Sequence, residues 1–515
     1  MSNIQVTHGT SLNDARSESV VLINPNNPLQ VVGASRKCKD IAAYDFTVAA
    51  VYSTDGGATW HDSAPLATPG WSGLSDPALA WDDSGNVFLV GAAIKNPPKI
   101  DYVGTAVYKS TDGGQTWSAP NLIHASAGDE KQWAAGDSGS ASFHGRVYIV
   151  WDDGAQLRFA RTLDHGNSWI GAGNDPAGSV LAPDSFSPEI NVSANGDICI
   201  VRSAFPGNAI KMIVSTDGGG SFHPAASPAA GIVRLEAALP PWKPNGWPVL
   251  PGGTFRVFTM PTACVFGQTV AVAWADYREG ASRIYYALSG DGGASWATGP
   301  SGQPLLTGAL PAGFHHFHPQ IVTDPNGVIG CAFYEFGPKP TTPRIDLVMA
   351  QSIDGGASFN RTTVTDQPWD PAVDAPVSLV DPIASFIGEY FGLDADARGF
   401  HPLWTDTRTG IQELWKATVP PRIAVPSQIY GQVAQILFGI IQDGGGGEFV
   451  GGHIRRIPPW GPPELDILLG VAAHRIAGLV SSREGIGLQK AAMTMIARVA
   501  QQEVRRLEGK AEGKG

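Results

Sequence analysis

With 515 residues the chain is longer than one ordinary domain, and its 43% hydrophobic and 16% charged residues allow a large packed core. The formal net charge of −12 argues against nucleic acid as the main partner, because phosphate binding needs a basic surface. No apolar run reaches the roughly 18 residues that span a bilayer, and the N-terminus lacks the layout of a signal peptide. We therefore expect a soluble chain with no membrane span, cytoplasmic by default, with export that needs no signal as the alternative.

A short motif of the form S/T-x-D-x-G-x-S/T-W/F recurs along the first 360 residues. The six copies are STDGGATW (53–60), STDGGQTW (110–117), TLDHGNSW (162–169), STDGGGSF (215–222), SGDGGASW (289–296) and SIDGGASF (352–359). The Asp side chain can accept hydrogen bonds from the backbone of its own turn, and the glycines supply positive φ. We interpret the motif as a scaffold turn that joins two antiparallel strands, since regular self-similarity is the signature of a repeat architecture.

The β-rich runs around the six motifs predict the number of blades. Each motif follows one β-rich run and has further runs upstream, which predicts a four-stranded blade for each repeat. A seventh unit at 388–419 has three such runs and no motif, and residues 3–8 can supply its missing outer strand. Closure by the first and last strands would also hide the sheet edges. We predict an all-β propeller with seven blades, in preference to six, closed by the N-terminal strand.

The C-terminal segment has a different periodicity. After Pro426 the spacing of apolar residues changes from two to 3.6, which predicts helices near 429–440, 463–479 and 487–507. We therefore divide the chain into a propeller at 1–420 and an α-helical tail at 421–515. A tail of this kind suits a protein-docking or oligomerisation element.

The six motifs resemble the Asp boxes of the sialidase superfamily of propellers, also known as BNR-repeat proteins. This resemblance spans residues 1–419, and the phrases WADYREGASRIYYALSGDGGASW and WTDTRTGIQELW are also similar to bacterial sialidase-like propellers of undefined activity. Asp boxes occur in glycosidases, lyases, lectins and structural propellers alike. The resemblance therefore implies the fold and leaves the function open.

Candidate site residues follow from the blade topology and from this resemblance. Starts of inner strands and loops from second to third strands share the face opposite the Asp boxes, where insertions at 223–260, 297–317 and 360–387 would also lie. A sialidase needs an acid, a nucleophile with its base, and arginines that clamp a carboxylate. The resemblance implies these roles for Asp76 as the acid, Tyr390 as the nucleophile, Glu389 or Glu189 as its base, and Arg36, Arg278 and Arg408 as the clamp.

Some features favour other functions. The Arg-Ile-Pro motif typical of sialidases is missing near the first inner strand, and Asp276-x-Arg278 and Asp406-x-Arg408 also fit ion pairs that pin loops. His318 suits a lyase that removes a proton from a uronate, whereas Trp133, expected in a loop, suits stacking on a sugar or anchoring a protein.

Three functions stay open at this point. We favour a glycan- or protein-binding propeller that uses the face opposite the Asp boxes. The alternatives are an exo-glycosidase of sialidase type acting on terminal acidic sugars and a polysaccharide lyase acting on uronate-containing glycans. We expect no cofactor and no metal, and buried free thiols for the four cysteines, which lack zinc-type spacing.

Overall fold

The computed structural model describes residues 2–241, 246–339, 342–373, 385–422, 448–450 and 453–455. The chain divides into two compact units, Met1–Pro421 and Arg422–Gly515. In the second unit the described residues form a hairpin of β30 (Glu448–Val450) and β31 (His453–Arg455). The three helices predicted for the tail lie outside the described residues. No helix in the described part of the chain is long and apolar enough to cross a membrane.

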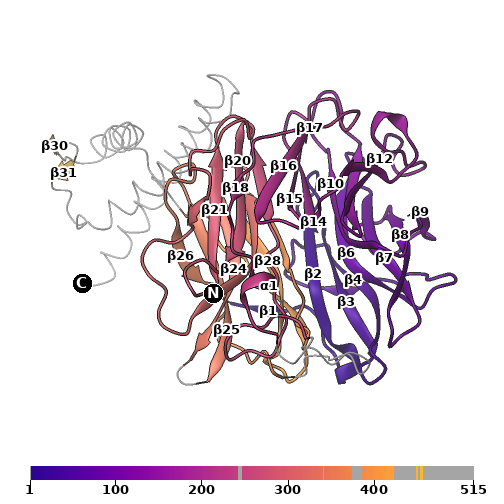
Figure 1. Cartoon of the computed structure of the whole chain (residues 1–515), viewed down its shortest axis with the longest axis horizontal. Helices are drawn as coiled ribbons and strands as arrows, with labels where there is room; N and C mark the ends of the chain where they lie inside the picture. Colours follow the sequence, from indigo (N-terminus) through magenta and orange to yellow (C-terminus); the bar gives the residue numbers. More distant parts are fainter. Residues whose placement is uncertain are drawn as a thin grey trace, which may run out of the picture. The chain divides into compact units, whose positions relative to one another are not determined.

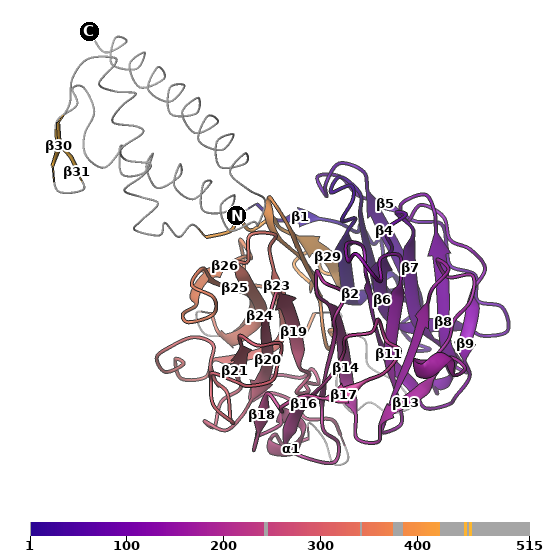
Figure 2. The same ribbon diagram turned by 90° about the horizontal axis from the view of Figure 1, so that it is seen from above.

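The first unit contains seven antiparallel sheets (Figures 1 and 2), each with a path of four strands. From the innermost strand outward, the blades are β2 (Arg16–Ile23), β3 (Val31–Asp40), β4 (Asp45–Ser53) and β5 (His61–Asp62); β6 (Gly73–Trp81), β7 (Val87–Lys95), β8 (Asp101–Ser110) and β9 (Asn121–His124); β10 (Asp129–Gly136), β11 (Val147–Asp153), β12 (Gln156–Thr162) and β13 (Ser179–Ala182); β14 (Phe186–Val192), β15 (Ile198–Ser203), β16 (Ala209–Ser215) and β17 (His223–Pro224); β19 (Thr262–Phe266), β20 (Thr269–Asp276), β21 (Arg283–Ser289) and β22 (Gln303–Pro304); β23 (His315–Thr323), β24 (Ile329–Pro338), β25 (Pro343–Ser352) and β26 (Asn360–Thr363); and β27 (Gly392–Asp396), β28 (Gly399–Asp406), β29 (Glu413–Lys416) and β1 (Ile4–Gln5). A short β18 (Ala229–Ala230) also pairs with β16, and the remaining short elements are α1 (Leu235–Ala238) and the 3-10 turns η1 (Leu12–Asp14) and η2 (Ala172–Asn174).

The innermost strands contact one another in a closed ring, in the order β2, β6, β10, β14, β19, β23, β27 and back to β2. This ring surrounds the central channel, and apolar side chains pack between neighbouring blades. All four cysteines are buried free thiols, as the sequence predicts. The prediction of a seven-bladed propeller is confirmed, and the alternative of six blades is excluded.

The N-terminal strand closes the last blade, as predicted. In Figure 2 the indigo strand β1 lies beside the orange strand β29, with Ile4 opposite Lys416 and Gln5 opposite Trp415. The backbone N–H of Val6 donates to the Leu414 carbonyl at 2.8 Å. The Thr7 hydroxyl accepts the Leu414 N–H at 2.9 Å and donates to the buried Glu413 carboxylate. The outer edge of blade 7 is therefore paired.

The Asp boxes are turns held by their own side chains. The Asp55 carboxylate accepts hydrogen bonds from the N–H groups of Ala58 and Thr59, both at 2.9 Å, and from the Thr59 and Ser53 hydroxyls. These bonds, led by that of the Thr59 hydroxyl, hold the pKa of Asp55 well below its usual range. Gly56 N–H donates to the Leu29 carbonyl in the turn between β2 and β3. The boxes and the turns between first and second strands therefore share one face of the propeller.

Candidate functional site at one end of the channel

Five of the seven innermost strands have a β-bulge near their start. The register of β2, β6, β10, β14 and β23 shifts at this point, over a gap of two residues in each strand. In every case the first residue of the gap has positive φ, between 46° and 53°. Positive φ costs about 1–2 kcal/mol in a residue other than glycine, and bulges commonly re-aim side chains beside active sites. We name these five residues the bulge ring: Glu18, Asp76, Lys131, Ser187 and His318.

The bulge ring marks the end of the channel opposite the Asp boxes. Each bulge lies near the start of its strand, whereas the end of the strand leads into a turn on the Asp-box face. Its charged members come from different blades, yet they interact electrostatically: Glu18 with Asp76, and His318 with Lys131. The Lys131 N–H also donates to the Asp76 carboxylate at 3.0 Å. The ring therefore brings acidic and basic side chains together at one end of the channel.

Two insertions add further groups to this end. Phe255 and Ser385 form a parallel bridge, and Arg256 and Glu389 are ion-paired with Nε and Oε1 2.6 Å apart. The guanidinium carbon of Arg256 lies 4.5 Å from the centroid of the Phe386 ring. Arg256 also interacts electrostatically with Glu18. Segments distant in the sequence thus meet beside the bulge ring.

Arg36, on β3, is a buried cation without an anionic partner. Its guanidinium carbon lies 3.6 Å from the Phe46 ring centroid and 4.4 Å from that of Phe386. The Nε and Nη2 atoms have no hydrogen-bond partner within the described ranges, and no described carboxylate forms an ion pair with Arg36. A buried charge of this kind is unusual, since burial is favourable only when the charge is paired.

Lys131 lies against two aromatic side chains. Its Nζ is 3.9 Å from the Tyr390 ring centroid and 4.5 Å from that of Trp133, and these two rings pack edge to face at 5.8 Å. Trp133 belongs to β10 and lines the channel, so the expectation that it lies in a loop is wrong. The bulge at Glu130 interrupts the alternation of side chains that would have marked this strand.

Burial shifts the protonation of this cluster. It raises the pKa of Glu18 to about 8, with further contributions from Asp76 and Glu389, and it raises the pKa of Glu189 to about 7. Burial, with Arg256 and Lys131, lowers the pKa of His318 to about 3, so this imidazole is neutral near pH 7. Both of its ring nitrogens are buried without a partner among the described residues. Carboxyls that titrate near neutrality beside a neutral imidazole are typical of functional sites.

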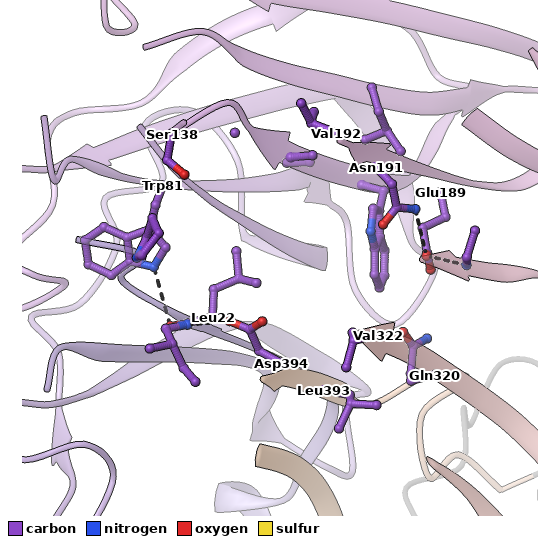
Figure 3. A pocket seen from close by; sticks show the side chains of 18 of the residues that line it. Leu22, Trp81, Ser138, Glu189, Asn191, Val192, Gln320, Val322, Leu393 and Asp394 are labelled. Atoms are coloured by element: carbon purple, nitrogen blue, oxygen red, sulfur yellow. Dashed lines mark hydrogen bonds between the residues drawn. The ribbon is translucent and has the colours of Figure 1, made fainter. Parts of the chain in front are cut away.

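A cavity of about 300 Å³ continues along the channel toward the Asp-box face. All seven innermost strands contribute to its lining, which is mainly apolar with a few polar side chains, including Asn191, Gln320 and Asp394 (Figure 3). Glu189 also faces this cavity, where it accepts hydrogen bonds from the Ala263 N–H at 2.8 Å and the Thr262 hydroxyl at 3.1 Å. The channel is therefore charged at one end and mainly apolar beyond it.

The structure brings most of the predicted site residues to this end of the channel. Asp76, His318, Glu389 and Tyr390 join Arg36 there, but Glu389 pairs with Arg256 and the Tyr390 hydroxyl has no partner in the described part of the chain. Burial raises the pKa of that hydroxyl well above its ordinary value.

Arg278 and Arg408 lie apart from this cluster. Arg278 pairs with Asp276 and has its guanidinium carbon 4.3 Å from the Tyr285 ring centroid, all within blade 5. Arg408 pairs with Asp406 on the same blade and with Asp366. These contacts match the alternative that each arginine pins a loop.

Three residues of the cluster escaped prediction: Glu18, Lys131 and Arg256. A signal was present for part of the ring, because Asp76, Ser187 and His318 each precede a proline at the same point of an inner strand. Glu18 and Lys131 precede Ser19 and Gln132 instead, so this signal is missing at their positions. Arg256 lies in an insertion outside the repeat.

Comparison with known proteins identifies the repeat. The BNR/Asp-box repeat model matches residues 51–62 and 108–119, in the first two blades. With seven sheets in a closed ring, the chain is an Asp-box repeat β-propeller. No curated protein sequence matches the chain.

Solved structures with a similar fold are distant in sequence. A protein of unknown function from Dyadobacter fermentans DSM 18053 has 12% identity and a TM-score of 0.45, with 82% of this chain and 98% of that chain covered. A Hadza microbial sialidase has 14% identity and a TM-score of 0.40, with 68% and 65% covered. An ulvan lyase, described as a new family of polysaccharide lyase, has 9% identity and a TM-score of 0.38, with 68% and 78% covered. Likenesses at these values say nothing about activity.

Proposed function

We propose that the propeller binds an acidic glycan at the end of the channel that holds the bulge ring, with a sugar carboxylate on Arg36. The observation that carries this proposal is the buried Arg36 guanidinium, whose Nε and Nη2 have no partner among the described residues. The planar fork of an arginine matches a carboxylate, and charge-assisted hydrogen bonds of this type are strong. A carboxylate ligand would supply the acceptors that these nitrogens lack.

Neighbouring groups suit the rest of such a ligand. Lys131 forms no ion pair with a carboxylate in the described ranges, so it is a second cation available to an acidic sugar. Glu18 and Asp76 offer carboxyl oxygens to sugar hydroxyls. Trp247 has 40% of its surface exposed and lies 5.8 Å from the Arg256 guanidinium, measured from the ring centroid. An exposed indole beside the charged cluster can stack on a sugar ring.

The geometry supports binding ahead of hydrolysis by a sialidase mechanism. That mechanism places several arginines on one carboxylate and a base beside the tyrosine nucleophile. Here Arg278 and Arg408 are engaged by Asp276 and Asp406. Glu389 is engaged by Arg256.

A polysaccharide lyase is the second candidate, and the neutral, unpartnered His318 favours it. In such a reaction a base removes the proton next to the uronate carboxylate, the bond to the leaving sugar oxygen breaks, and a carbon–carbon double bond forms. Arg36 would neutralise the carboxylate, and His318 or Tyr390 would accept the proton. The same acidic glycan would serve as substrate.

A glycan array with parallel release assays tests this proposal. The full-length chain is applied to sialosides, uronate polysaccharides and matched neutral glycans, and the bound glycans are incubated with the protein and analysed for products. We expect binding to acidic glycans only. An unsaturated uronate product would identify the lyase, whereas free sialic acid would identify hydrolysis. Absence of binding to every acidic glycan would overturn the proposal.

Arg36→Gln should weaken binding of the acidic glycan by roughly 10-fold to 100-fold, because a hydrogen bond to a charged group contributes about 1.5–3 kcal/mol. Arg278→Gln is the matched control, since Arg278 lies on the same face but is engaged by Asp276. Isothermal titration calorimetry measures both variants. Equal affinities of Arg36→Gln and the unaltered protein would contradict the assignment of Arg36.

A further inference from the structure

A second group of chemically active side chains lies on the Asp-box face, between blades 2 and 3. The turn after β6 supplies Asp82 and Asp83, the third Asp box supplies His165, and the turn after β10 supplies His144. His165 Nδ1 is 2.9 Å from Asp82 Oδ2 and 3.7 Å from Asp83 Oδ1. His144 Nδ1 is 2.7 Å from Asp83 Oδ2. Donor atoms of Asp82, Asp83 and His165 all lie within 4.8 Å of one another.

His165 occupies a position where the other five Asp boxes have glycine. The five glycines have φ between 65° and 75°, and His165 adopts the same left-handed conformation with φ of 56°. That conformation favours glycine, so the histidine is retained at a cost of about 1 kcal/mol. The scaffold itself does not need an imidazole at this position.

The two aspartates lack a basic partner other than histidine. Within the described ranges neither Asp82 nor Asp83 forms an ion pair with a lysine or an arginine. Lys109 is close, but its Nζ donates to the backbone carbonyl of His165 at 2.7 Å. Asp82 is fully buried, and buried carboxylates need a counter-charge. With neutral histidines the cluster would carry two uncompensated negative charges.

We propose that Asp82, Asp83 and His165 bind a divalent metal ion, for which zinc is the best fit. One imidazole nitrogen and two carboxylate oxygens are ligands that zinc accepts, with a fourth position left for water. Asp82 Oδ1 accepts the N–H groups of Ser84 at 3.0 Å and Asn86 at 2.8 Å, which orients Oδ2 toward His165. His144 holds Asp83 in the same way. The ion joins the turn of blade 2 to the Asp box of blade 3.

His165→Gly restores the glycine of the other boxes, so it removes the ligand without straining the turn. Full-length protein treated with a chelator is titrated with zinc chloride, and bound zinc is counted by mass spectrometry after dialysis. The unaltered protein should bind one zinc ion more than His165→Gly, and zinc should raise its melting temperature but not that of the variant. Asp83→Asn should behave like His165→Gly. His223→Ala is the control, because His223 is exposed on β17, away from the cluster.

Two results would overturn the zinc site. One is equal zinc stoichiometry and affinity for the unaltered protein and His165→Gly, which would place any binding elsewhere. The other is no zinc binding by the unaltered protein, which would leave ordinary hydrogen bonds between the histidines and the aspartates. Both readouts are independent of glycan binding, so neither depends on the proposed function.

Discussion

Removal of residues 1–9 should lower the free energy of unfolding by roughly 5 kcal/mol or more. The deletion takes away β1 and leaves the edge of β29 unpaired. It also removes Thr7 and Gly9, whose hydroxyl and N–H bind the Glu413 carboxylate, a side chain in a residue only 1% exposed. An unpaired carboxylate in that position costs about 3–5 kcal/mol. Chemical denaturation followed by tryptophan fluorescence measures the change.

A point substitution separates ring closure from a general effect of truncation. Thr7→Val keeps the shape of the side chain but leaves both Glu413 and the Leu414 N–H without the Thr7 hydroxyl. The expected loss is about 2–4 kcal/mol, since each unsatisfied buried group costs about 1–3 kcal/mol. Thr10→Val is the control, because its hydroxyl makes only an exposed contact with Asp14. Equal stability of Thr7→Val and Thr10→Val would contradict the closure of blade 7 by β1.

Glu18→Gln should stabilise the protein, and the gain should grow with pH. Burial, with Asp76 and Glu389, raises the pKa of Glu18 to about 8 from a model-compound value of 4.5. Between these two pH values the folded state binds a proton that the unfolded state has released, so stability falls as pH rises through this window. Glutamine has no such proton. The variant and the unaltered protein should therefore differ little in pH-dependent stability below pH 4.5 and by roughly 3–5 kcal/mol above pH 8.

An opposite control makes this prediction specific. Asp217 lies in the fourth Asp box, where hydrogen bonds from Ser221 and Ser215 lower its pKa to about 2 despite some burial. Asp217→Asn should destabilise the protein at neutral pH, and this deficit should disappear as pH falls from 4 to 2. Urea denaturation of the three proteins at pH 5, 6.5 and 8 is the measurement. A constant difference for Glu18→Gln across these pH values would exclude a raised pKa at Glu18.

The fold was more predictable than the site because the two depend on different signals. Six Asp boxes are local turns with a fixed order of residues, and strands at regular intervals follow from them. The boxless unit and the N-terminal strand could be matched because the first six blades supply the template. The site depends instead on bulges that reverse the expected alternation, as at Trp133.

Arg256 illustrates the other limit of prediction. It reaches the site through the bridge between Phe255 and Ser385, two residues 130 positions apart in the sequence. No repeat constrains the path of either insertion, so their meeting could not be derived from the order of residues. Arg36, by contrast, was predicted because β3 follows the template of every second strand. What its position could not indicate is that the guanidinium is buried without an anionic partner.

The measurement that tests the account most directly compares one acidic glycan with the same glycan after its carboxyl groups are reduced to alcohols. Reduction keeps the sugar rings and hydroxyls but removes the anion that the Arg36 guanidinium would bind. Calorimetric titration of the unaltered protein should give an affinity at least about 10-fold weaker for the reduced glycan. Equal affinity for the two glycans would contradict recognition of a carboxylate at the bulge ring.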